Sequence, residues 1–269
     1  MLIFWIFLLF AAAVTAAVVL AGGAAWLAVL SFVLAFLMAH LLLLLFARLV
    51  SLRDDLSRPD AKQNRSLRWI AGQVGQLLCL YGGARPVITG TGLLPETERF
   101  LFVCNHRSMF DPLLVMGWLQ EWNIQFISKP SNMRIPLAGP AAEKLGFLAI
   151  DRENDRAALK TILTAVDYLK RGLCSVGIYP EGTRSRTGEL LPFHSGSFKI
   201  AQRAKAPLVI ACVHGTEKLK RGYCLRPRRC WLEILECVPA ERVKTMNTQE
   251  LAAYSRERIE TRLKEAEGA

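Results

Sequence analysis

The chain has 269 residues, a formal net charge of +11 and a hydrophobic content of 52%. This length fits one domain of ordinary to large size, or a smaller domain with an attached segment. The apolar residues are concentrated at the N-terminus, where residues 1–47 contain no charged side chain, so the composition excludes a uniformly soluble chain.

The N-terminal apolar block, residues 1–47, is predicted to form a transmembrane helical hairpin. A bilayer core is about 30 Å thick and a helix rises about 1.5 Å per residue, so the block is too long for one crossing and suits two. Ala21-Gly22-Gly23 is the flexible point near its middle. We expect helices over residues 2–20 and 25–47, joined by a tight glycine turn.

Other structures for this block are less consistent with its composition. A cleaved signal peptide is disfavoured because no Lys or Arg precedes the apolar stretch, which is also far longer than a signal core. A buried hairpin of a soluble protein would need a polar outer face, and the block has none. A shallow hairpin that enters one leaflet stays open as an alternative to two full crossings, which the length of each arm favours.

A basic segment follows the apolar block and sets the expected orientation. Residues 48–84 are predicted to form a basic, interfacial helical segment that ends at Gly82-Gly83. Lys and Arg that flank a membrane segment stay on the cytoplasmic side, so both chain ends are expected in the cytoplasm. In a bacterium the membrane would be the plasma or inner membrane. The flanking basic residues are Arg48, Arg53, Arg58, Lys62, Arg65 and Arg68.

The cysteines are odd in number, and no CxxC motif occurs. Most of them lie in apolar, strand-like surroundings. This pattern favours buried free thiols in a reducing compartment over a disulfide framework or a zinc site. The cysteines are Cys79, Cys104, Cys174, Cys212, Cys224, Cys230 and Cys237.

Short apolar runs alternate with longer amphipathic patterns after residue 84. Because strands that alternate with helices form parallel sheets covered on both faces, we predict an α/β domain over residues 85–269, with a mainly parallel sheet flanked by helices. Strands are expected at residues 86–90, 99–105, 124–129, 146–152, 174–180, 207–215 and 230–238. Helices are expected at residues 112–122, 155–172, 198–205 and 248–266, with a loop rich in Pro and Gly after residue 129.

Three polar loops directly follow predicted strands. They are NHRSMFD at residues 105–111, Asp151-Arg152, and PEGTRS at residues 180–185. In an open parallel sheet, reactive loops gather at the carboxyl ends of the strands. The three loops are therefore expected to share one edge of the sheet.

The NHRSMFD loop is compatible with several chemistries. A metal site would need further ligands, and the chain has only four histidines. A serine nucleophile would place Ser108 beside His106, but the GxSxG frame of such serines is absent. A His–Asp dyad would let Asp111 orient His106 and make it more basic. Asp111 could equally cap the helix that starts at Pro112, so the residues alone leave dyad and cap equal.

The loop YPEGTRS, residues 179–185, has features of a phosphate-binding turn. Gly182 permits a tight turn, and Arg184 carries a planar fork that suits phosphate oxygens. Glu181 could orient that arginine or bind a hydroxyl, and Arg152 could add a second cation. The alternative is a surface turn with local ion pairs, which is the better interpretation of such a turn taken alone.

Four sequence blocks, in order, resemble those of a known family. NHRSMFD matches the pattern NHxSxxD, with the HX4D spacing, and YPEGTRS matches FPEGTRS with Tyr179 in place of Phe. GFLAIDR and PLVIACVHGT resemble the middle and fourth blocks. Over about residues 80–240 the chain is similar to the 1-acylglycerol-3-phosphate acyltransferases of the glycerolipid acyltransferase superfamily.

The resemblance implies a reaction and a role for each motif residue. His106 would act as general base on the sn-2 hydroxyl of lysophosphatidic acid, with Asp111 orienting it, and the hydroxyl would attack the donor thioester directly. Asn105 and Ser108 would support the loop or the developing oxyanion. No metal or redox cofactor is implied. The residues implied in binding the glycerol phosphate are Arg152, Glu181, Gly182, Thr183 and Arg184, with Lys129 before the Pro/Gly loop.

The resemblance also implies the partners: an acyl-CoA or acyl-carrier protein donor, a lysophosphatidic acid acceptor, and membrane lipid. The product would be phosphatidic acid for phospholipid biosynthesis. The basic run at residues 218–229 suits an anionic donor or lipid, and it lacks the alternating aromatic residues of a nucleic-acid binder. His194 and Ser195 stand where the family commonly has a more basic stretch. The alternatives are acylation of another lysolipid, a non-catalytic membrane lipid-binding protein, and a serine hydrolase using Ser108.

Overall fold

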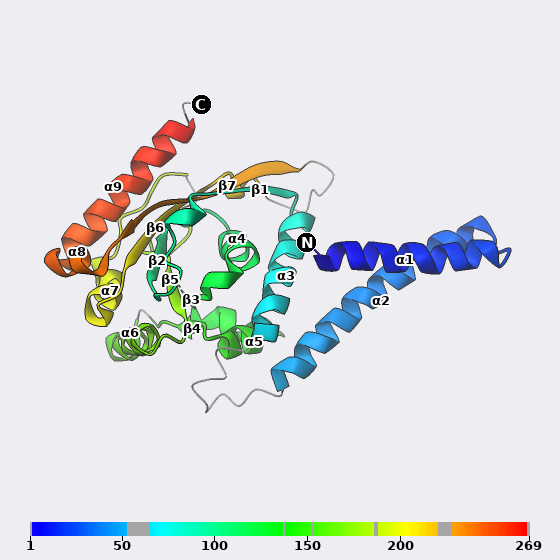
Figure 1. Cartoon of the computed structure of the whole chain (residues 1–269), viewed down its shortest axis with the longest axis horizontal. Coiled ribbons are helices and arrows are strands. Elements are labelled where there is room, and N and C mark those ends of the chain that lie inside the picture. The colour runs from blue at the N-terminus through cyan, green and yellow to red at the C-terminus, as the bar shows by residue number, and fades with distance from the viewer. Residues whose placement is uncertain are drawn as a thin grey trace.

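Figure 1 shows the computed structural model of the chain, with an N-terminal helical hairpin attached to an α/β domain. The structure describes residues 2–52, 65–136, 138–151, 153–185, 188–219 and 227–267. Several residues named above lie outside these ranges, so their predicted roles stay predictions. They are Arg53, Arg58, Lys62, Arg152, Cys224 and most of the basic run.

The two N-terminal helices form the predicted hairpin. They are α1 (Leu2–Leu20) and α2 (Ala25–Leu52), and both are long and apolar enough to cross a membrane. Gly22 turns the chain with a positive φ of 77°, a conformation that glycine adopts without strain. Most of the apolar side chains of the hairpin are exposed, so its surface suits a lipid environment better than water.

Helix α3 (Arg65–Tyr81) connects this hairpin to the α/β domain. Its Ile70 packs in one apolar cluster with residues of both hairpin helices, and the Tyr81 hydroxyl bonds to His40 of α2. On its other side, Gly75 lets α3 approach α4 closely, because a Cβ there would lie 2.9 Å from the Leu113 carbonyl oxygen. The predicted helical segment before the sheet is therefore confirmed over residues 65–81, as a helix packed on both sides.

In the described residues the domain contains a seven-stranded sheet with the order β1-β7-β6-β2-β5-β3-β4. Neighbouring strands are parallel except for the antiparallel pair β6–β7, so the predicted mainly parallel sheet is confirmed. The strands are β1 (Ala84–Thr89), β2 (Leu101–Cys104), β3 (Ile124–Ser128), β4 (Leu148–Ala149), β5 (Ser175–Ile178), β6 (Leu208–His214) and β7 (Arg228–Val238).

Helices cover both faces of the sheet (Figure 1). Successive residues of β2 alternate between the two faces, as the two-residue period of a strand requires. Leu101 and Val103 pack in one apolar cluster, and Phe102 and Cys104 pack in the other. The helices of the domain are α4 (Asp111–Trp118), α5 (Ala138–Leu145), α6 (Asp155–Lys170), α7 (Lys199–Ala204), α8 (Ala240–Thr245) and α9 (Thr248–Glu267). All six cysteines in the described ranges are free thiols, and five of them are buried.

The prediction of a loop rich in Pro and Gly after residue 129 is wrong. This segment contains a 3-10 helix, Pro130–Arg134, followed by α5, which begins at Ala138. Pro140 is compatible with α5 because it lies in the first turn, where a backbone N–H has no partner within the helix. The expected strand at residues 146–152 is reduced to Leu148–Ala149.

Candidate active site

Two polar loops meet at the carboxyl ends of the parallel neighbours β2 and β5, as predicted. The Ser185 amide donates a hydrogen bond to the His106 carbonyl at 3.0 Å. The His106 amide donates to Glu181 Oε1 at 2.7 Å. The third predicted loop follows the short strand β4, at the edge of the sheet beyond β3, and its Arg152 lies outside the described residues.

His106 and Asp111 form a direct pair. His106 Nδ1 lies 2.8 Å from Asp111 Oδ2, and the carboxylate is almost fully buried, with 1% of the residue exposed. Because an ionised carboxylate only accepts hydrogen bonds, the neutral imidazole carries its proton on Nδ1. Its Nε2 then keeps a free lone pair, and no described residue bonds to that nitrogen.

Asp111 is held by the loop and by the turn after β6 rather than by its own helix. Oδ2 also accepts the Arg107 and Ser108 amides, both at 2.7 Å. Oδ1 accepts the hydroxyl of Thr216 at 2.6 Å. The two amides precede α4, the hydroxyl comes from a distant turn, and the N-cap of that helix is Phe110, so Asp111 does not act as a helix cap. The residues alone left a His106–Asp111 dyad and a helix-capping Asp111 equal, and the structure shows the dyad.

Aromatic rings support the imidazole from one side. The ring of His106 stacks on that of Tyr179, with 4.1 Å between centroids, and Tyr179 stacks in turn on Phe126. The His106 side chain is 19% exposed, so it is reachable from solvent. Burial, followed by the nearby Asp111 carboxylate, raises the pKa of the Tyr179 phenol well above its usual value, so this ring stays neutral.

Glu181 organises the second loop from a buried position. Besides the His106 amide, its carboxylate accepts the Leu191 amide at 3.0 Å. Burial raises the pKa of this carboxyl, and the two backbone hydrogen bonds partly offset the rise. The carboxylate therefore links loops, whereas the side chains of Thr183 and Arg184, two and three residues further on, are exposed. Gly182, between Glu181 and Thr183, has a positive φ of 74°, a conformation that favours glycine at this position of the turn.

Asn105 and Ser108 have structural partners in the same loop. The Asn105 side chain exchanges two 2.8 Å hydrogen bonds with the backbone of Val213, which fixes β2 to β6. The Ser108 hydroxyl accepts the Phe110 amide at 3.4 Å, and among the described residues it forms no bond with His106. Lys129 lies exposed at the end of β3. Hydrogen bonds thus link His106 with Asp111 and Glu181, and Ser108 with Asp111. Asn105 is bonded instead to Val213, and the Gly182 amide to the Tyr179 carbonyl within the second loop.

Two further residues of the site were not singled out from the sequence. Thr216 lies just after β6, 105 residues beyond the carboxylate that it binds, and its only sequence signal is the HGT at the end of the fourth block. Arg107 occupies the variable position of NHxSxxD and is half-buried beside the loops. Its guanidinium acts to lower the pKa of Glu181, against the larger effect of burial.

Comparisons with known proteins agree with this arrangement. Residues 85–214 match the model of a protein family described as Acyltransferase. A 1-acyl-sn-glycerol-3-phosphate acyltransferase of Cocos nucifera is 34% identical over 61% of this chain and 49% of its own length. The enzyme of the same name from Salmonella typhimurium is 31% identical over 61% of this chain and 67% of its own length. The chain thus aligns with about half of the first relative and two thirds of the second.

A solved structure shares the fold. The crystal structure of the 1-acyl-sn-glycerophosphate (LPA) acyltransferase PlsC from Thermotoga maritima superposes with a TM-score of 0.70. The match covers 87% of this chain and 93% of that one, at 23% sequence identity. The overall fold described above is therefore one that a crystal structure shares.

Proposed function

This chain belongs to the 1-acyl-sn-glycerol-3-phosphate acyltransferase family, and we propose on that premise that it acylates the sn-2 hydroxyl of 1-acylglycerol-3-phosphate, giving phosphatidic acid. One observation supports the proposal above the others. His106 is held at 2.8 Å by a buried carboxylate, with its second ring nitrogen unbonded to any described residue. That is the arrangement of a base that takes a proton from a hydroxyl.

The proposed reaction is a direct acyl transfer. His106 Nε2 takes the proton of the acceptor hydroxyl as its oxygen attacks the carbonyl carbon of the donor thioester. The new C–O bond forms, the C–S bond breaks, and the imidazolium returns the proton to the departing thiolate. Asp111 stabilises the imidazolium between these two steps, because no other described cation pairs with it and its hydrogen bonds come from His106, two amides and one hydroxyl.

Acceptor binding is assigned to the second loop. Arg184 and Thr183 are exposed just past the turn at Gly182, and a guanidinium presents two parallel donors to phosphate oxygens. Arg107 lies at the same loops and would add a cation. Arg152 and Lys129 stay in the proposed set, on the family motifs alone.

The donor and the placement of the protein are also part of the proposal. Acyl-CoA and acyl-carrier protein are both anionic thioester donors, and either would approach a basic cytoplasmic face. The hairpin would hold the α/β domain at the cytoplasmic surface of the membrane, where the lysolipid acceptor resides. We keep the division into a hairpin at 1–47, an interfacial segment at 48–84 and a catalytic domain at 85–269 as a proposal.

The decisive experiment measures thiol release from a thioester donor by the detergent-purified full chain. Release is expected with lysophosphatidic acid and not with lysophosphatidylcholine or without acceptor. His106→Ala is the catalytic blank, and both donor types are tested. Release with lysophosphatidylcholine alone would reassign the acceptor, and no release from folded protein with any acceptor would overturn the enzymatic assignment.

Two variants test the parts of the site separately. Arg184→Ala is expected to raise the Michaelis constant for lysophosphatidic acid by about tenfold or more, with a smaller change in kcat, because it removes a charged hydrogen-bond donor. Ser108→Ala is expected to keep activity, and a fluorophosphonate should not label the protein. Covalent labelling of Ser108 would instead support a serine hydrolase.

A further inference from the structure

An open cavity of about 360 Å³ lies at the amino-terminal edge of the sheet. Arg99 precedes β2 by two residues, whereas His106 follows the same strand, so the two ends are separated by on the order of 20 Å of extended chain. The cavity is therefore distinct from the candidate active site. Its lining residues are Arg65, Arg68, Arg99, Glu121 and Asn123.

The arginines at this cavity have few partners. Arg65 and Arg68 form no hydrogen bond or ion pair with any residue in the described ranges. Arg99 donates two long hydrogen bonds to the carbonyls of Gly172 and Trp122, at 3.3 and 3.5 Å. Burial lowers the pKa of Arg68, and the charges of Arg99 and Arg65 lower it further. The three guanidinium groups repel one another, and a bound anion would relieve that repulsion.

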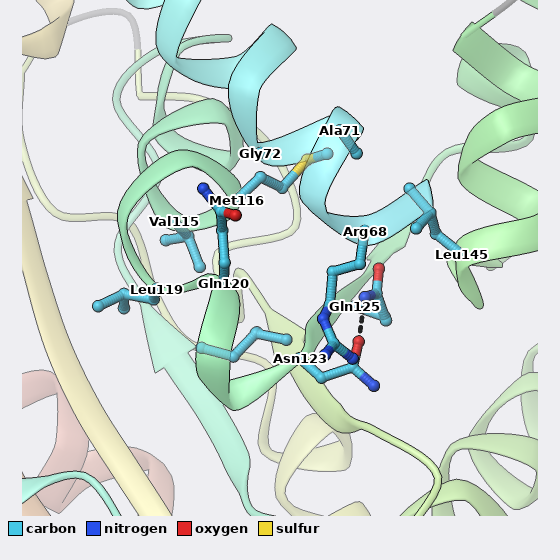
Figure 2. Close-up of a pocket in the computed structure, with 11 residues that line it drawn as sticks. Arg68, Ala71, Gly72, Val115, Met116, Leu119, Gln120, Asn123, Gln125 and Leu145 are labelled. Atoms are coloured by element: carbon cyan, nitrogen blue, oxygen red, sulfur yellow. Dashed lines mark hydrogen bonds between the residues drawn. The ribbon is translucent and has the colours of Figure 1, made fainter. Parts of the chain in front are cut away.

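A buried polar atom that has no hydrogen-bond partner in the described structure lies at a smaller hollow lined by the same arginine. Figure 2 shows the Arg68 side chain reaching from α3 toward Asn123 and Gln125. These residues line a small hollow of about 20 Å³. Gln125 is 5% exposed, and its Nε2 donates to Asn123 Oδ1 at 2.7 Å. Its Oε1 is buried and accepts no hydrogen bond in the described structure. The hollow has room for one hydroxyl-sized group, which Oε1 could accept.

The charges at the cavity suit a phosphate group. Three arginines and one glutamate line it, so their formal charges sum to +2. Glu121 is exposed and forms no ion pair with these arginines, which leaves their planar donor forks available. Such forks match phosphate oxygens in geometry.

The position of α3 favours a lipid as the source of that phosphate. Ile70, two residues after Arg68, packs against Ile3 and Leu43, near the ends of the hairpin helices that lie away from the turn. Those ends share one surface of the membrane if the hairpin is embedded. Trp69, next to Arg68, is 43% exposed, and tryptophan is enriched at the level of lipid headgroups.

From these observations we propose that Arg65, Arg68 and Arg99 bind the phosphate of an anionic glycerophospholipid headgroup at the sheet edge opposite His106. Gln125 Oε1 accepts a hydroxyl of the same headgroup. This accessory site holds the α/β domain against the membrane surface beside the hairpin. It is independent of acyl transfer, because none of its residues belongs to the cluster around Asp111.

The test is thermal unfolding of the full chain in detergent micelles, with added phosphatidylglycerol, phosphatidylcholine or inorganic phosphate. Phosphatidylglycerol is expected to raise the Tm of the wild type, since a ligand that binds the native state stabilises it. Arg65→Gln and Arg68→Gln should each weaken the apparent affinity on the order of tenfold. The control is Arg203→Gln, which removes the same charge from an exposed position on α7. It should leave the stabilisation by phosphatidylglycerol unchanged.

The outcomes separate the sources of the ligand. Equal stabilisation by phosphatidylglycerol and phosphatidylcholine, or equal loss in Arg203→Gln, would overturn the site. Stabilisation by inorganic phosphate as large as that by the lipid, lost in Arg65→Gln, would overturn the lipid assignment in favour of a soluble phosphate. Arg65 is exposed, so its variant leaves the packing of α3 unchanged and remains informative if Arg68→Gln fails to fold.

Discussion

Two histidine–carboxylate pairs lie at the same edge of the sheet and differ in one respect that matters chemically. His106 and Asp111 are 2.8 Å apart after β2, and His214 and Glu233 are also 2.8 Å apart at the end of β6. Each imidazole stacks on an aromatic ring, Tyr179 in the first pair and Trp231 in the second. Distance and stacking alone therefore do not distinguish a base from a structural pair.

The hydrogen-bond partners of the two carboxylates distinguish the proposed catalytic pair from the structural one. Asp111 receives its remaining hydrogen bonds from two amides and the Thr216 hydroxyl, and within the described ranges no Lys or Arg pairs with it. Glu233 also pairs with Arg262 at 2.9 Å, and that hydrogen bond raises the pKa of the arginine. An imidazolium forming beside Asp111 gains the full interaction with the carboxylate, whereas one beside Glu233 competes with a guanidinium.

Removing each imidazole gives the largest expected contrast. His106→Ala should lower kcat by about 10³-fold, because general base catalysis contributes about 10²–10⁴-fold. His214→Ala should lower kcat by less than about tenfold, since it removes a largely buried structural pair that takes no part in the proposed reaction. Thiol release at saturating donor measures both. A larger loss for His214→Ala than for His106→Ala would reverse the assignment of the base.

Neutralising the carboxylate partner of each imidazole tests the same contrast between the two pairs. Asp111→Asn keeps the shape but lacks the charge that stabilises the imidazolium, so kcat should fall on the order of 10²–10⁴-fold. Glu233→Gln should leave kcat within about tenfold and lower the free energy of unfolding by about 1–3 kcal/mol, because it weakens the bond to Arg262. Denaturant unfolding and kcat, measured on both variants, separate catalysis from stability. Equal effects of the two variants on kcat would remove the distinction.

Thr216 should carry a smaller, positioning effect on the first pair. Thr216→Val leaves Asp111 Oδ1 buried without its hydroxyl donor, which costs about 1–3 kcal/mol of stability. The shifted carboxylate should lower kcat by about tenfold, with little change in the Michaelis constant of the acceptor. Thr216→Ser keeps the hydroxyl and is expected to restore both values. If the serine variant matched the valine variant, the hydrogen bond would not be the cause.

The smallest expected effect is the contribution of Glu181 to the pH dependence of the free energy of unfolding. Burial raises the pKa of its carboxyl above the ordinary value of 4.5, so the folded state binds this proton more tightly than the unfolded state does. The stability that this group contributes is complete below the ordinary pKa and is lost as the pH rises through the raised one.

The matched control for this pH effect is Glu181→Gln, whose side chain does not titrate. The free energy of unfolding of the wild type minus that of this variant should therefore decrease with rising pH, by at most about 1.4 kcal/mol per unit. Denaturant unfolding from pH 4 upward would show it. A difference that rises with pH would mean that the carboxylate is stabilised in the folded state.

Much of this arrangement was predictable from local sequence. The hairpin helices follow from an uncharged run of a suitable length interrupted at Ala21-Gly22-Gly23, and the observed α1 begins and ends where predicted. The loops after β2 and β5 were expected to meet, because parallel strands present their carboxyl ends on one edge. The loop after residue 129 was predicted wrongly because Pro and Gly were interpreted as helix breakers, although a first turn tolerates both.

The residues of the motif and the order of its blocks were readable in the sequence itself, since each block is local. Only the tertiary structure decided what Asp111 binds, because Thr216 reaches it from the turn after β6, 105 residues away. It also decided that Arg65, Arg68 and Arg99 surround one cavity, and that Glu233 is shared with Arg262. The physical reason is that charge and burial depend on which segments pack together, and that is set by the sheet order rather than by neighbours in the chain.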